Sequence, residues 1–399
     1  MEILIVSSGV GLFEPKSGSQ NRFYNLTRGL CTGHNNITLL IPEKFRSHAE
    51  YTNMNEYNFK NYTLGRKELN IFVDINVHFA RELMILLSRK QFDVIQIYSY
   101  RGILLTKLLS TIFRQKAILV YDAHNVYADS EKYAMTDPTR SKVEKIVVPV
   151  VTSILEAIAV KLVDKILAVS EDDKRRFTEK YNIEEGKIRV VPSGVKIIQN
   201  SSITKSEDIR KKLGIEANQV VIVFHGSYFY FPNKEAITSI VNYIAPEVGK
   251  SSKNALFVIA GTGVPVFFKD NIMSIGFYED IYSLLNACDI AIVPILGGGG
   301  TRLKVLDYLG IGLPVVTTRK GIEGIRAKNS QDALICDGLD REFIEQLLCL
   351  VENRSKRVNI SNNAKKLAMT AYDWEKIGKD LNAYYRQLIG NNNDHHESV

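Results

Sequence analysis

The sequence predicts an α/β protein built from two parallel sheets, each covered by helices on both faces. Short β-branched runs recur along the 399 residues, and each is followed by a longer segment with helical spacing of its apolar residues. The strands are apolar almost throughout, which is typical of parallel strands buried on both faces. At about 100–200 residues per domain, the length also favours two domains.

Twelve candidate strands are too many for one sheet, so we expect six in each half of the chain. The expected strands are 3–7, 37–41, 94–98, 118–121, 165–169 and 188–191, then 220–225, 256–260, 272–275, 290–293, 314–317 and 333–335. Proline, glycine and polar residues at 192–194 and 199–206 place the linker there. We expect domains at 1–192 and 193–372, a final helix at 373–390 and a disordered polar tail at 391–399.

The composition is that of a folded protein, with 45% apolar and 24% charged residues and a mean hydropathy of −0.07. The four cysteines are far apart and form no C-x-x-C pair, which excludes a disulfide framework and a zinc cluster and favours a reducing compartment. The N-terminal run predicts a buried strand and not a signal peptide. The most apolar stretch, 146–163, contains Pro149, Glu156 and Lys161 and is too polar for a membrane span. We therefore expect a cytoplasmic protein.

Positive charge is concentrated in the first half of the chain, where residues 1–199 hold 28 Lys and Arg against 22 Asp and Glu. Such an excess suits an anionic partner, either a membrane surface or a phospholipid-linked substrate, and it is also common on ordinary solvated surfaces. No nucleic-acid-binding pattern is present, so nucleic acid is not expected as a partner. The segment 101–116 places five apolar residues on one side among basic ones. It packs on the sheet or lies peripherally on an anionic bilayer at the inner face of the membrane.

The segment 294–318 carries the strongest functional signal. A strand runs into four consecutive glycines, 297–300, and a helix beginning at Thr301 then presents Arg302, Lys304 and Asp307. Glycines let backbone N–H groups approach a ligand, and a helix N-terminus and two cations favour an anion, so this loop suits a diphosphate. Asp307 shares a helix face with Lys304 and suits ribose hydroxyls. The alternative is a glycine-rich turn with a surface ion pair.

Two further segments follow predicted strands or open predicted helices. His124 follows the strand at 118–121 and suits a hydrogen bond to a substrate hydroxyl, with Asp122 orienting its ring. Alternatively, this histidine caps a neighbouring helix. Gly18 and Ser19 precede a helix beginning at Gln20 and present N–H groups to a distal phosphate, or Ser19 is a plain helix N-cap.

These segments, in their order and spacing, resemble glycosyltransferase family 4. The resemblance rests on Ser17-Gly18-Ser19, on Asp122-Ala123-His124-Asn125, on Val169-Ser170-Glu171, on Val191-Pro192-Ser193-Gly194-Val195, on Phe224-His225-Gly226-Ser227, on Ile259-Ala260-Gly261-Thr262-Gly263, on Ile275-Gly276-Phe277, on the glycine run and on Trp374. It extends along nearly the whole chain.

The resemblance implies a GT-B fold, in which two Rossmann-like domains face each other across a cleft and the last helix returns to the N-terminal domain. It implies a glycosyltransferase that retains anomeric configuration and needs neither metal nor other cofactor. The N-terminal domain would bind a glycan, lipid-linked or small-molecule acceptor, and the C-terminal domain a UDP- or GDP-linked sugar. The catalytic residues would be His124, Arg302 and Lys304. The nucleotide-sugar-binding residues would be Gly18, Ser19, Gly226, Gly261, Phe277, Gly299, Gly300, Thr301 and Asp307.

The chain departs from the family pattern at the donor helix. The family has two glutamates eight positions apart, whereas this chain has Gly299 and the shorter acid Asp307. The chain therefore lacks the acid that the resemblance assigns to the hydroxyls of the donor sugar. No D-x-D motif is present, which agrees with a diphosphate neutralised by Arg302 and Lys304. The alternatives are a sugar-nucleotide epimerase or phosphorylase of the same architecture, or a non-catalytic protein that binds sugar nucleotides.

Overall fold

The structure is a computed structural model of the chain that describes residues 1–12, 18–45, 52–64, 67–68, 70–136, 141–197 and 206–396. It divides into two compact units. The first contains Met1–Ser193 and Trp374–Val399, and the second contains Gly194–Asp373. Among the described residues, no helix is both long enough and apolar enough to cross a membrane.

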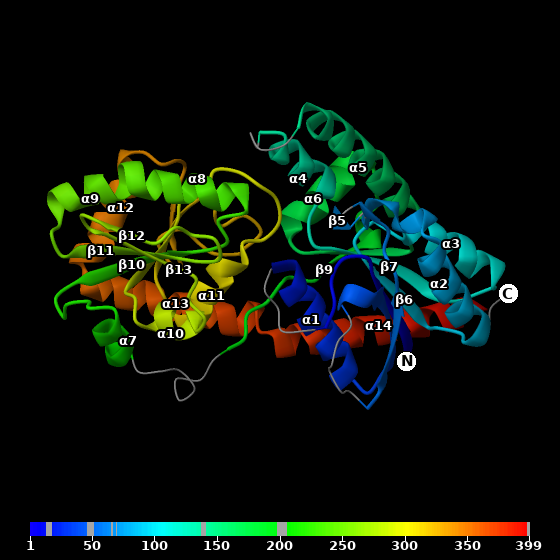
Figure 1. The fold of residues 1–399 in the computed structure, drawn as a ribbon. Helices are drawn as coiled ribbons and strands as arrows, with labels where there is room; N and C mark the ends of the chain where they lie inside the picture. The colour runs from blue at the N-terminus through cyan, green and yellow to red at the C-terminus, as the bar shows by residue number, and fades with distance from the viewer. Residues whose placement is uncertain are drawn as a thin grey trace. The chain divides into compact units, whose positions relative to one another are not determined.

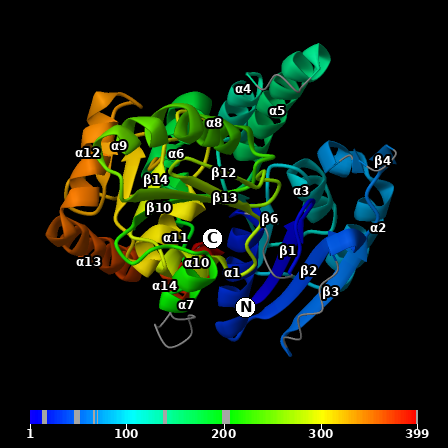
Figure 2. The ribbon, with the colours of Figure 1, turned by 60° about the vertical axis from the view of Figure 1, so that its left-hand side comes forward.

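The first unit is organised around a parallel sheet, in which seven strands lie within the described residues. Their order is β3-β2-β1-β6-β7-β8-β9, and Figure 2 shows β1, β2 and β3 side by side. The strands are β1 (Glu2–Ser7), β2 (Asn36–Pro42), β3 (Met54–Phe59), β6 (Val94–Tyr98), β7 (Ile118–Ala123), β8 (Lys165–Ala168) and β9 (Ile188–Val190), and a separate hairpin is formed by β4 (Thr63–Leu64) and β5 (Lys67–Glu68).

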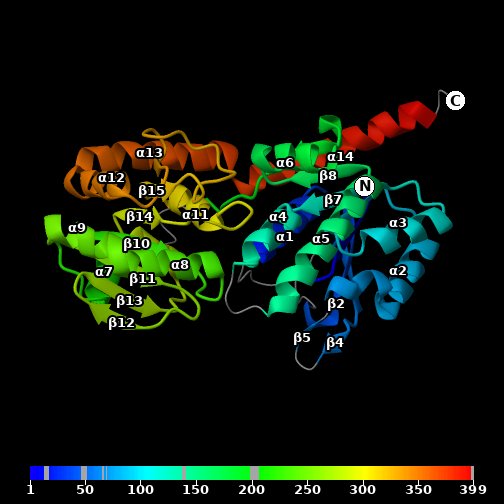
Figure 3. The same ribbon diagram turned by 90° about the horizontal axis from the view of Figure 1, so that it is seen from above.

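Alternate residues of these strands enter two cores because successive side chains point to opposite faces of a sheet. Ile3 and Ile5 of β1 pack under α1 and α14, whereas Leu4 and Val6 pack under α2, α3 and α5. Figure 3 shows α2 and α3 next to each other. The helices are α1 (Gly18–Thr32), η1 (Glu43–Phe45), η2 (Asn70–Ile75), α2 (Val77–Arg89), α3 (Ile103–Ile112), α4 (Tyr127–Ala134), α5 (Lys142–Leu162), α6 (Glu171–Tyr181), η3 (Glu185–Lys187) and α14 (Trp374–His396).

Helix α14 completes the core of the first unit from the far end of the chain. A Cβ added to Gly29 of α1 would lie 2.7 Å from the Cα of Gly378 of α14, so the two helices touch through their backbones. Asn382 also donates a 2.7 Å hydrogen bond to the carbonyl oxygen of Gly29. The helix continues to His396, so residues 391–396, expected to be disordered, are helical; no proline interrupts the i to i−4 ladder there. Residues 397–399 lie outside the described residues.

The second unit has a sheet of seven described strands in the order β12-β13-β11-β10-β14-β15-β16. In Figure 1, α8, α9 and α12 lie on one side of these strands and α10, α11 and α13 on the other. The strands are β10 (Val220–His225), β11 (Ala255–Ala260), β12 (Phe267–Lys269), β13 (Ile272–Gly276), β14 (Ile290–Val293), β15 (Val315–Thr318) and β16 (Leu334–Cys336). The helices are α7 (Ser206–Lys212), α8 (Phe231–Ser239), η5 (Ile240–Ile244), α9 (Ala245–Ser251), α10 (Ile281–Asn286), α11 (Leu303–Ile311), α12 (Arg341–Glu352) and α13 (Arg354–Ala371).

The predicted fold class is confirmed, since two sheets with covering helices are present, and each of the twelve predicted strands is found. The sequence analysis missed the edge strands β3 and β12 and the hairpin β4–β5. Strand β3 has the sequence MNEYNF, in which polar residues interrupt any apolar run, and β12 has only three residues. Strand β12 also pairs antiparallel with β13, so the second sheet is mixed and not purely parallel as expected.

Candidate functional site

The glycine loop of the second unit connects β14 to α11. Gly298 and Gly300 have φ values of 94° and 72°, a region that residues with a Cβ rarely adopt, so these two positions require glycine. The helix begins at Leu303 with Arg302 as its extended N-cap, two residues later than expected. Thr301 is therefore part of the loop and not of the helix, and the loop can bend around a ligand at the helix N-terminus.

The Arg302 side chain is buried inside this loop, with 5% of the residue exposed. Its Nη2 donates to the carbonyl oxygen of Gly297 at 2.8 Å, and its Nη1 donates to those of Gly299 and Gly300. The guanidinium thus holds the loop in shape as well as supplying charge. Arg302 Nε and Thr301 Oγ1 are buried without a hydrogen-bond partner among the described residues, which leaves two donors for a polar ligand.

Lys304 lies on the first turn of α11. Its Nζ donates a 2.6 Å hydrogen bond to Asn233 Oδ1 and lies 4.0 Å from the centre of the Phe224 ring. Burial first, and then the nearby charge of Arg302, hold the pKa of Lys304 well below its usual range. Two cations that are crowded and poorly solvated in this way would be stabilised by a ligand with two or more negative charges.

Asp307 follows Lys304 by one turn of α11, as its spacing predicts. Its Oδ1 accepts a 3.0 Å hydrogen bond from Tyr282, and its Oδ2 lies 3.8 Å from His225 Nε2, beyond hydrogen-bond reach. Burial raises the pKa of Asp307 to about 6. Burial and the charge of Lys304 lower the pKa of His225 to about 3, so this imidazole is neutral and its Nδ1 contacts Tyr308 Oη at 3.0 Å.

Three of the expected donor-binding residues follow the carboxyl ends of neighbouring strands. A Cβ added to Gly226 would lie 2.6 Å from Lys304 Nζ, and one added to Gly261 would lie 2.0 Å from the carbonyl oxygen of Gly226. The two loops therefore approach each other and Lys304 as closely as backbone atoms allow. Phe277, after β13, is 69% exposed. The second unit thus brings Gly226 and Gly261 together with Lys304, while Phe277 presents an aromatic ring to solvent.

In the first unit, His124 follows β7 and is held by aromatic rings. Its imidazole stacks on the Tyr98 ring at 4.9 Å between centroids, and the Tyr127 hydroxyl lies 3.1 Å from Nε2. Burial, with smaller contributions from Arg22 and Arg101, lowers the pKa of His124 to about 3. A neutral imidazole can form hydrogen bonds with hydroxyl groups but cannot act as a charged acid at neutral pH.

The expectation that Asp122 orients the His124 ring is wrong. Asp122 is fully buried and pairs with Arg22, whose Nη2 and Nε lie 2.7 and 2.9 Å from Oδ1. Gln96 donates to its other oxygen at 3.2 Å. A buried carboxylate needs a charged partner more than a neutral one, so the pairing with arginine takes precedence over the histidine. The alternative in which His124 caps a helix also finds no support, because the residue before α4 is Val126.

The start of α1 is connected to His124 through Tyr98. The Tyr98 hydroxyl donates a 2.8 Å hydrogen bond to the carbonyl oxygen of Ser19. Two predicted site residues of the first unit therefore contact the same side chain, Ser19 at the Tyr98 hydroxyl and His124 on the face of its ring. The helix begins at Gly18, and Ser17 lies outside the described residues. A contact of Gly18 and Ser19 with a phosphate stays a prediction.

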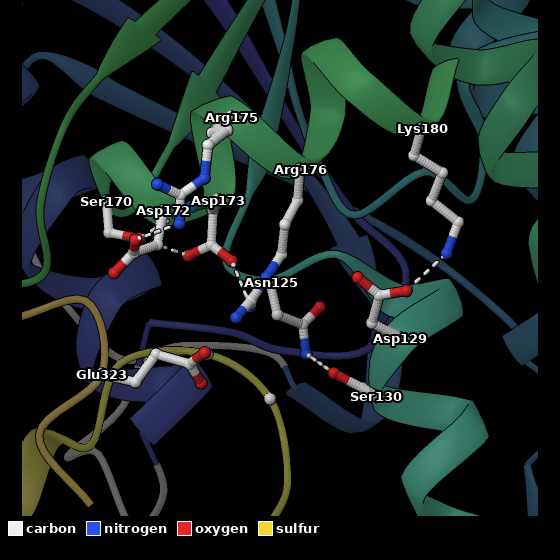
Figure 4. A network of polar contacts seen from close by, with 12 residues as sticks. Asn125, Asp129, Ser130, Ser170, Asp172, Asp173, Arg175, Arg176, Lys180 and Glu323 are labelled. Carbon is white, nitrogen blue, oxygen red and sulfur yellow. Dashed lines mark hydrogen bonds and ion pairs between the residues drawn. The ribbon is translucent and has the colours of Figure 1, made fainter. Parts of the chain in front are cut away.

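A polar network stabilises the segment after His124, as Figure 4 shows. Asn125 donates to Ser130 at 3.1 Å, and Lys180 of α6 pairs with Asp129 of α4 at 2.5 Å. Ser170 is the N-cap of α6 and accepts a 3.0 Å hydrogen bond from the backbone N–H of Asp173, which explains the Ser-Glu motif locally as a helix start. Asn125 Oδ1 is buried without a partner among the described residues.

The sequence analysis missed several residues that shape these sites. Asn233, Tyr282 and Tyr98 reach their partners only through the tertiary fold, and no spacing in the chain signals them. Tyr127 lies three residues after His124, and this spacing could have indicated their contact. Ser99 is also unusual, because its φ of 86° lies in a region that residues with a Cβ rarely adopt, directly after β6. No group of three or more His, Cys, Asp or Glu within the described ranges is placed to hold a metal ion.

Comparison with known families identifies the chain. The family described as Glycosyltransferase Family 4 matches residues 16–198, and the family described as Glycosyl transferases group 1 matches residues 219–353. The chain belongs to glycosyltransferase family 4. The matches cover the described His124 segment in one half and the glycine loop in the other. This glycosyltransferase is therefore an enzyme of the transferase class, as its motifs predict.

Individual relatives agree with this assignment. The chain is 21% identical over 319 residues to the UDP-Gal:alpha-D-GlcNAc-diphosphoundecaprenol alpha-1,3-galactosyltransferase of Escherichia coli, which covers 77% of this chain and 78% of that one. The solved structure of Anabaena Alr3699/HepE in complex with UDP has a TM-score of 0.70 at 15% identity and covers 97% of this chain and 100% of that one. Sucrose-phosphate synthase from Thermosynechococcus elongatus has a TM-score of 0.74 at 12% identity, with 98% and 100% covered. The glycosyltransferase shares the two-domain GT-B architecture of these solved structures.

Proposed function

We propose that the glycosyltransferase transfers a sugar from a UDP-sugar that binds to its C-terminal unit. The observation that carries this proposal is the pair of cations at a glycine loop and a helix N-terminus, the buried Arg302 and the half-buried Lys304. A diphosphate is the part of a UDP-sugar that such a site recognises. Asp307 would accept hydrogen bonds from the ribose hydroxyls through Oδ2, and the exposed Phe277 ring would contact the base. UDP is favoured over GDP because UDP occurs in the names of the relatives above.

The proposed reaction retains anomeric configuration and uses no metal. The bond between the anomeric carbon and the diphosphate oxygen breaks, and the acceptor oxygen bonds to the same face of that carbon. The acceptor proton passes to the departing phosphate oxygen, so no protein base is needed. Arg302, Lys304 and the N-terminus of α11 would stabilise the charge on the leaving diphosphate. The neutral His124 would hold a hydroxyl of the sugar or the acceptor by a hydrogen bond.

We further propose that the acceptor, bound by the N-terminal unit, is a sugar linked to a lipid through a diphosphate. The name of the Escherichia coli relative specifies such an acceptor, GlcNAc-diphosphoundecaprenol. The basic excess of residues 1–199 suits the negative charge of this class of acceptor. Arg101 supports the proposal locally, because its Nε is buried without a partner in the described part of the chain and its guanidinium lies 5.7 Å from the Tyr127 ring that contacts His124.

The choice of nucleotide is tested by thermal unfolding of the protein with UDP-, GDP-, ADP- and dTDP-sugars. A donor present at a hundred times its dissociation constant stabilises the folded protein by about 2.7 kcal/mol, a readily measured shift in Tm. We expect the shift with UDP-sugars. A shift with another nucleotide alone would contradict the UDP assignment, and no shift with any would contradict donor binding.

The role of Arg302 is tested by the rate of UDP release from the donor, with and without acceptor. Arg302→Ala should lower kcat/KM by about 10²–10³, the usual cost of losing a group that stabilises developing charge. Arg302→Lys should not restore it, because a single ammonium cannot reach three loop carbonyls at once. Arg319→Ala, on the surface of the same unit, is the control. Near-wild-type turnover of Arg302→Ala would overturn the proposal, and UDP release without any transferred sugar would favour the epimerase alternative.

A further inference from the structure

Helix α3 exposes most of the apolar side that the sequence gives it. Leu104, Leu108 and Ile112, spaced four residues apart, are 48–60% exposed. The residues of this helix that enter the core are Ile103 and Leu109. Packing on the sheet therefore accounts for only part of the apolar side, and a stripe along the outer side of α3 has no partner within the described residues.

Helix α5 carries a second stripe of the same kind. Ile146, Val150, Ile154 and Ile158 follow one another at four-residue intervals and are 40–65% exposed. Such spacing places all four on one side of the helix. The opposite side of α5 is buried and contributes Ala159 and Val160 to the same core as α3.

The two stripes point the same way. Helices α3 and α5 contact each other on one face of the sheet, and the Tyr100 hydroxyl lies 3.3 Å from Thr152 Oγ1 between them. Because both helices bury their inner sides in one core, their outer sides share one surface. We call this surface the apolar face and define it by the seven residues of the two stripes. Contiguous exposed apolar side chains, unlike single scattered ones, usually mark a surface that binds a partner or a membrane.

The border of the apolar face is basic. Lys107 of α3 and Lys165 both lie near Lys187, and after burial their positive charges lower the pKa of Lys187. Lys187 Nζ in turn donates to the carbonyl oxygen of Lys161, the last lysine of α5. The acidic groups facing this cluster are Asp164 and Glu184.

The two helices themselves carry few acids. The segment 101–116 has none, and the acids of α5 are Glu144, at its first turn, and Glu156, which is buried. Acidic side chains are therefore scarce along the exposed sides of both helices, where they would repel a negatively charged surface.

We propose that the apolar face binds the surface of an anionic lipid bilayer, with its aliphatic side chains among the acyl chains and its lysines at the headgroups. An apolar stripe bordered by Lys and Arg is the pattern of helices that lie in a membrane interface. A second copy of the chain would fit this face less well, because self-association would bring two basic borders together. The inference goes beyond the sugar transfer proposed above and does not depend on it.

The test is flotation of the purified full-length protein with vesicles of phosphatidylcholine alone or mixed with phosphatidylglycerol. We expect binding to the anionic vesicles that weakens with added salt, since screening reduces the attraction between lysines and headgroups. The double variant Leu108→Gln/Ile154→Gln should lower the partition coefficient by about tenfold or more, because two apolar contacts with the acyl chains are lost. The variant Lys107→Gln/Lys161→Gln should lower binding to anionic vesicles only.

Matched controls distinguish the effect of the apolar face from the effect of removing any exposed apolar or lysine side chain. Val358→Gln/Met369→Gln removes two apolar side chains that are similarly exposed on α13, and Lys253→Gln/Lys366→Gln removes two surface lysines of the second unit. Both controls should bind vesicles as the wild type does, and unchanged Tm values show that all variants fold. The proposal is overturned if the wild type ignores anionic vesicles. It is also overturned if the apolar variant binds anionic vesicles as the wild type does. A change of oligomeric state in sedimentation, without a change in vesicle binding, would show that the face binds a second copy instead.

Discussion

Lys304 Nζ and Asn233 Oδ1 form a 2.6 Å hydrogen bond that joins α11 to α8 across 71 residues of sequence. Asn233 also donates through Nδ2 to the carbonyl oxygen of Ser227 at 2.9 Å, so one amide fixes both the ammonium and the loop after β10. An amide supplies this geometry without adding charge.

Replacing that amide by a carboxylate tests whether the site binds an anion. Asn233→Asp keeps the size of the side chain but removes the donor to Ser227, and it places a negative charge beside Lys304, where it would repel a diphosphate. We expect the affinity for a UDP-sugar to fall by about tenfold to a hundredfold, as measured by calorimetry. Asn363→Asp, on α13, should leave the affinity unchanged. Tighter binding by Asn233→Asp would show that the ligand of this site is not an anion.

The pKa of Asp307 makes the stability of the fold depend on pH. Its pKa of about 6 exceeds the ordinary value of an unfolded aspartate, so the folded chain binds more protons between about pH 4 and 6. The stabilising contribution of this group is therefore present at low pH and is lost as the pH rises through that window.

Donor affinity should instead increase as the pH rises, because the ionised carboxylate of Asp307 accepts hydrogen bonds from the ribose hydroxyls. The dissociation constant of a UDP-sugar should be about tenfold higher at pH 5 than at pH 7. The diphosphate of a UDP-sugar is esterified at both ends and does not titrate in this range, nor does His225, whose pKa is about 3. Asp307→Asn should bind weakly at both pH values. An equally steep pH dependence in Asp307→Asn would assign the titration to another group.

An alanine at Gly226 should weaken donor binding, whereas an alanine at Gly261 should destabilise the fold. The Cβ of Gly226→Ala would displace the end of the Lys304 side chain, so the affinity for a UDP-sugar should fall while Tm changes little. The Cβ of Gly261→Ala would meet the backbone of Gly226, which cannot move without disturbing β10. This variant should lose about 1–3 kcal/mol of unfolding free energy. Gly338→Ala has open space around its Cβ and is the control. Equal effects of all three variants would contradict the close approach of the loops.

Asp122 has a structural role, because its carboxylate neutralises the buried guanidinium of Arg22. Asp122→Asn should lower the free energy of unfolding by about 3 kcal/mol in urea, because an uncompensated arginine is left in the core. Asp172→Asn breaks an exposed pair with Arg175 and should cost less than about 1 kcal/mol. The folded fraction of Asp122→Asn should retain a kcat within about tenfold of the wild type. A large loss of kcat with unchanged stability would instead restore the view that Asp122 orients His124.

The sequence predicted the parts of the fold that depend on local patterns. Apolar runs located the strands because parallel strands are buried on both faces, and the spacing of Lys304 and Asp307 gave their shared helix face correctly. Contacts between distant segments were not predictable in this way. Asp122 pairs with Arg22 and not with its neighbour His124, and Lys304 bonds to Asn233 of another helix, because buried groups bond to whatever the tertiary fold brings near them.

The contact between Gly29 and Gly378 has a consequence for synthesis of the protein. A ribosome produces α14 only after the whole second unit, so the apolar side of α1 stays uncovered while that unit emerges. The usual order, in which the N-terminal domain of a nascent chain folds first, is therefore reversed for the final step. The second unit can mature as soon as it has emerged, whereas the first must wait for α14. Premature termination shortly before residue 374 would leave a well-folded donor-binding unit attached to an incomplete partner.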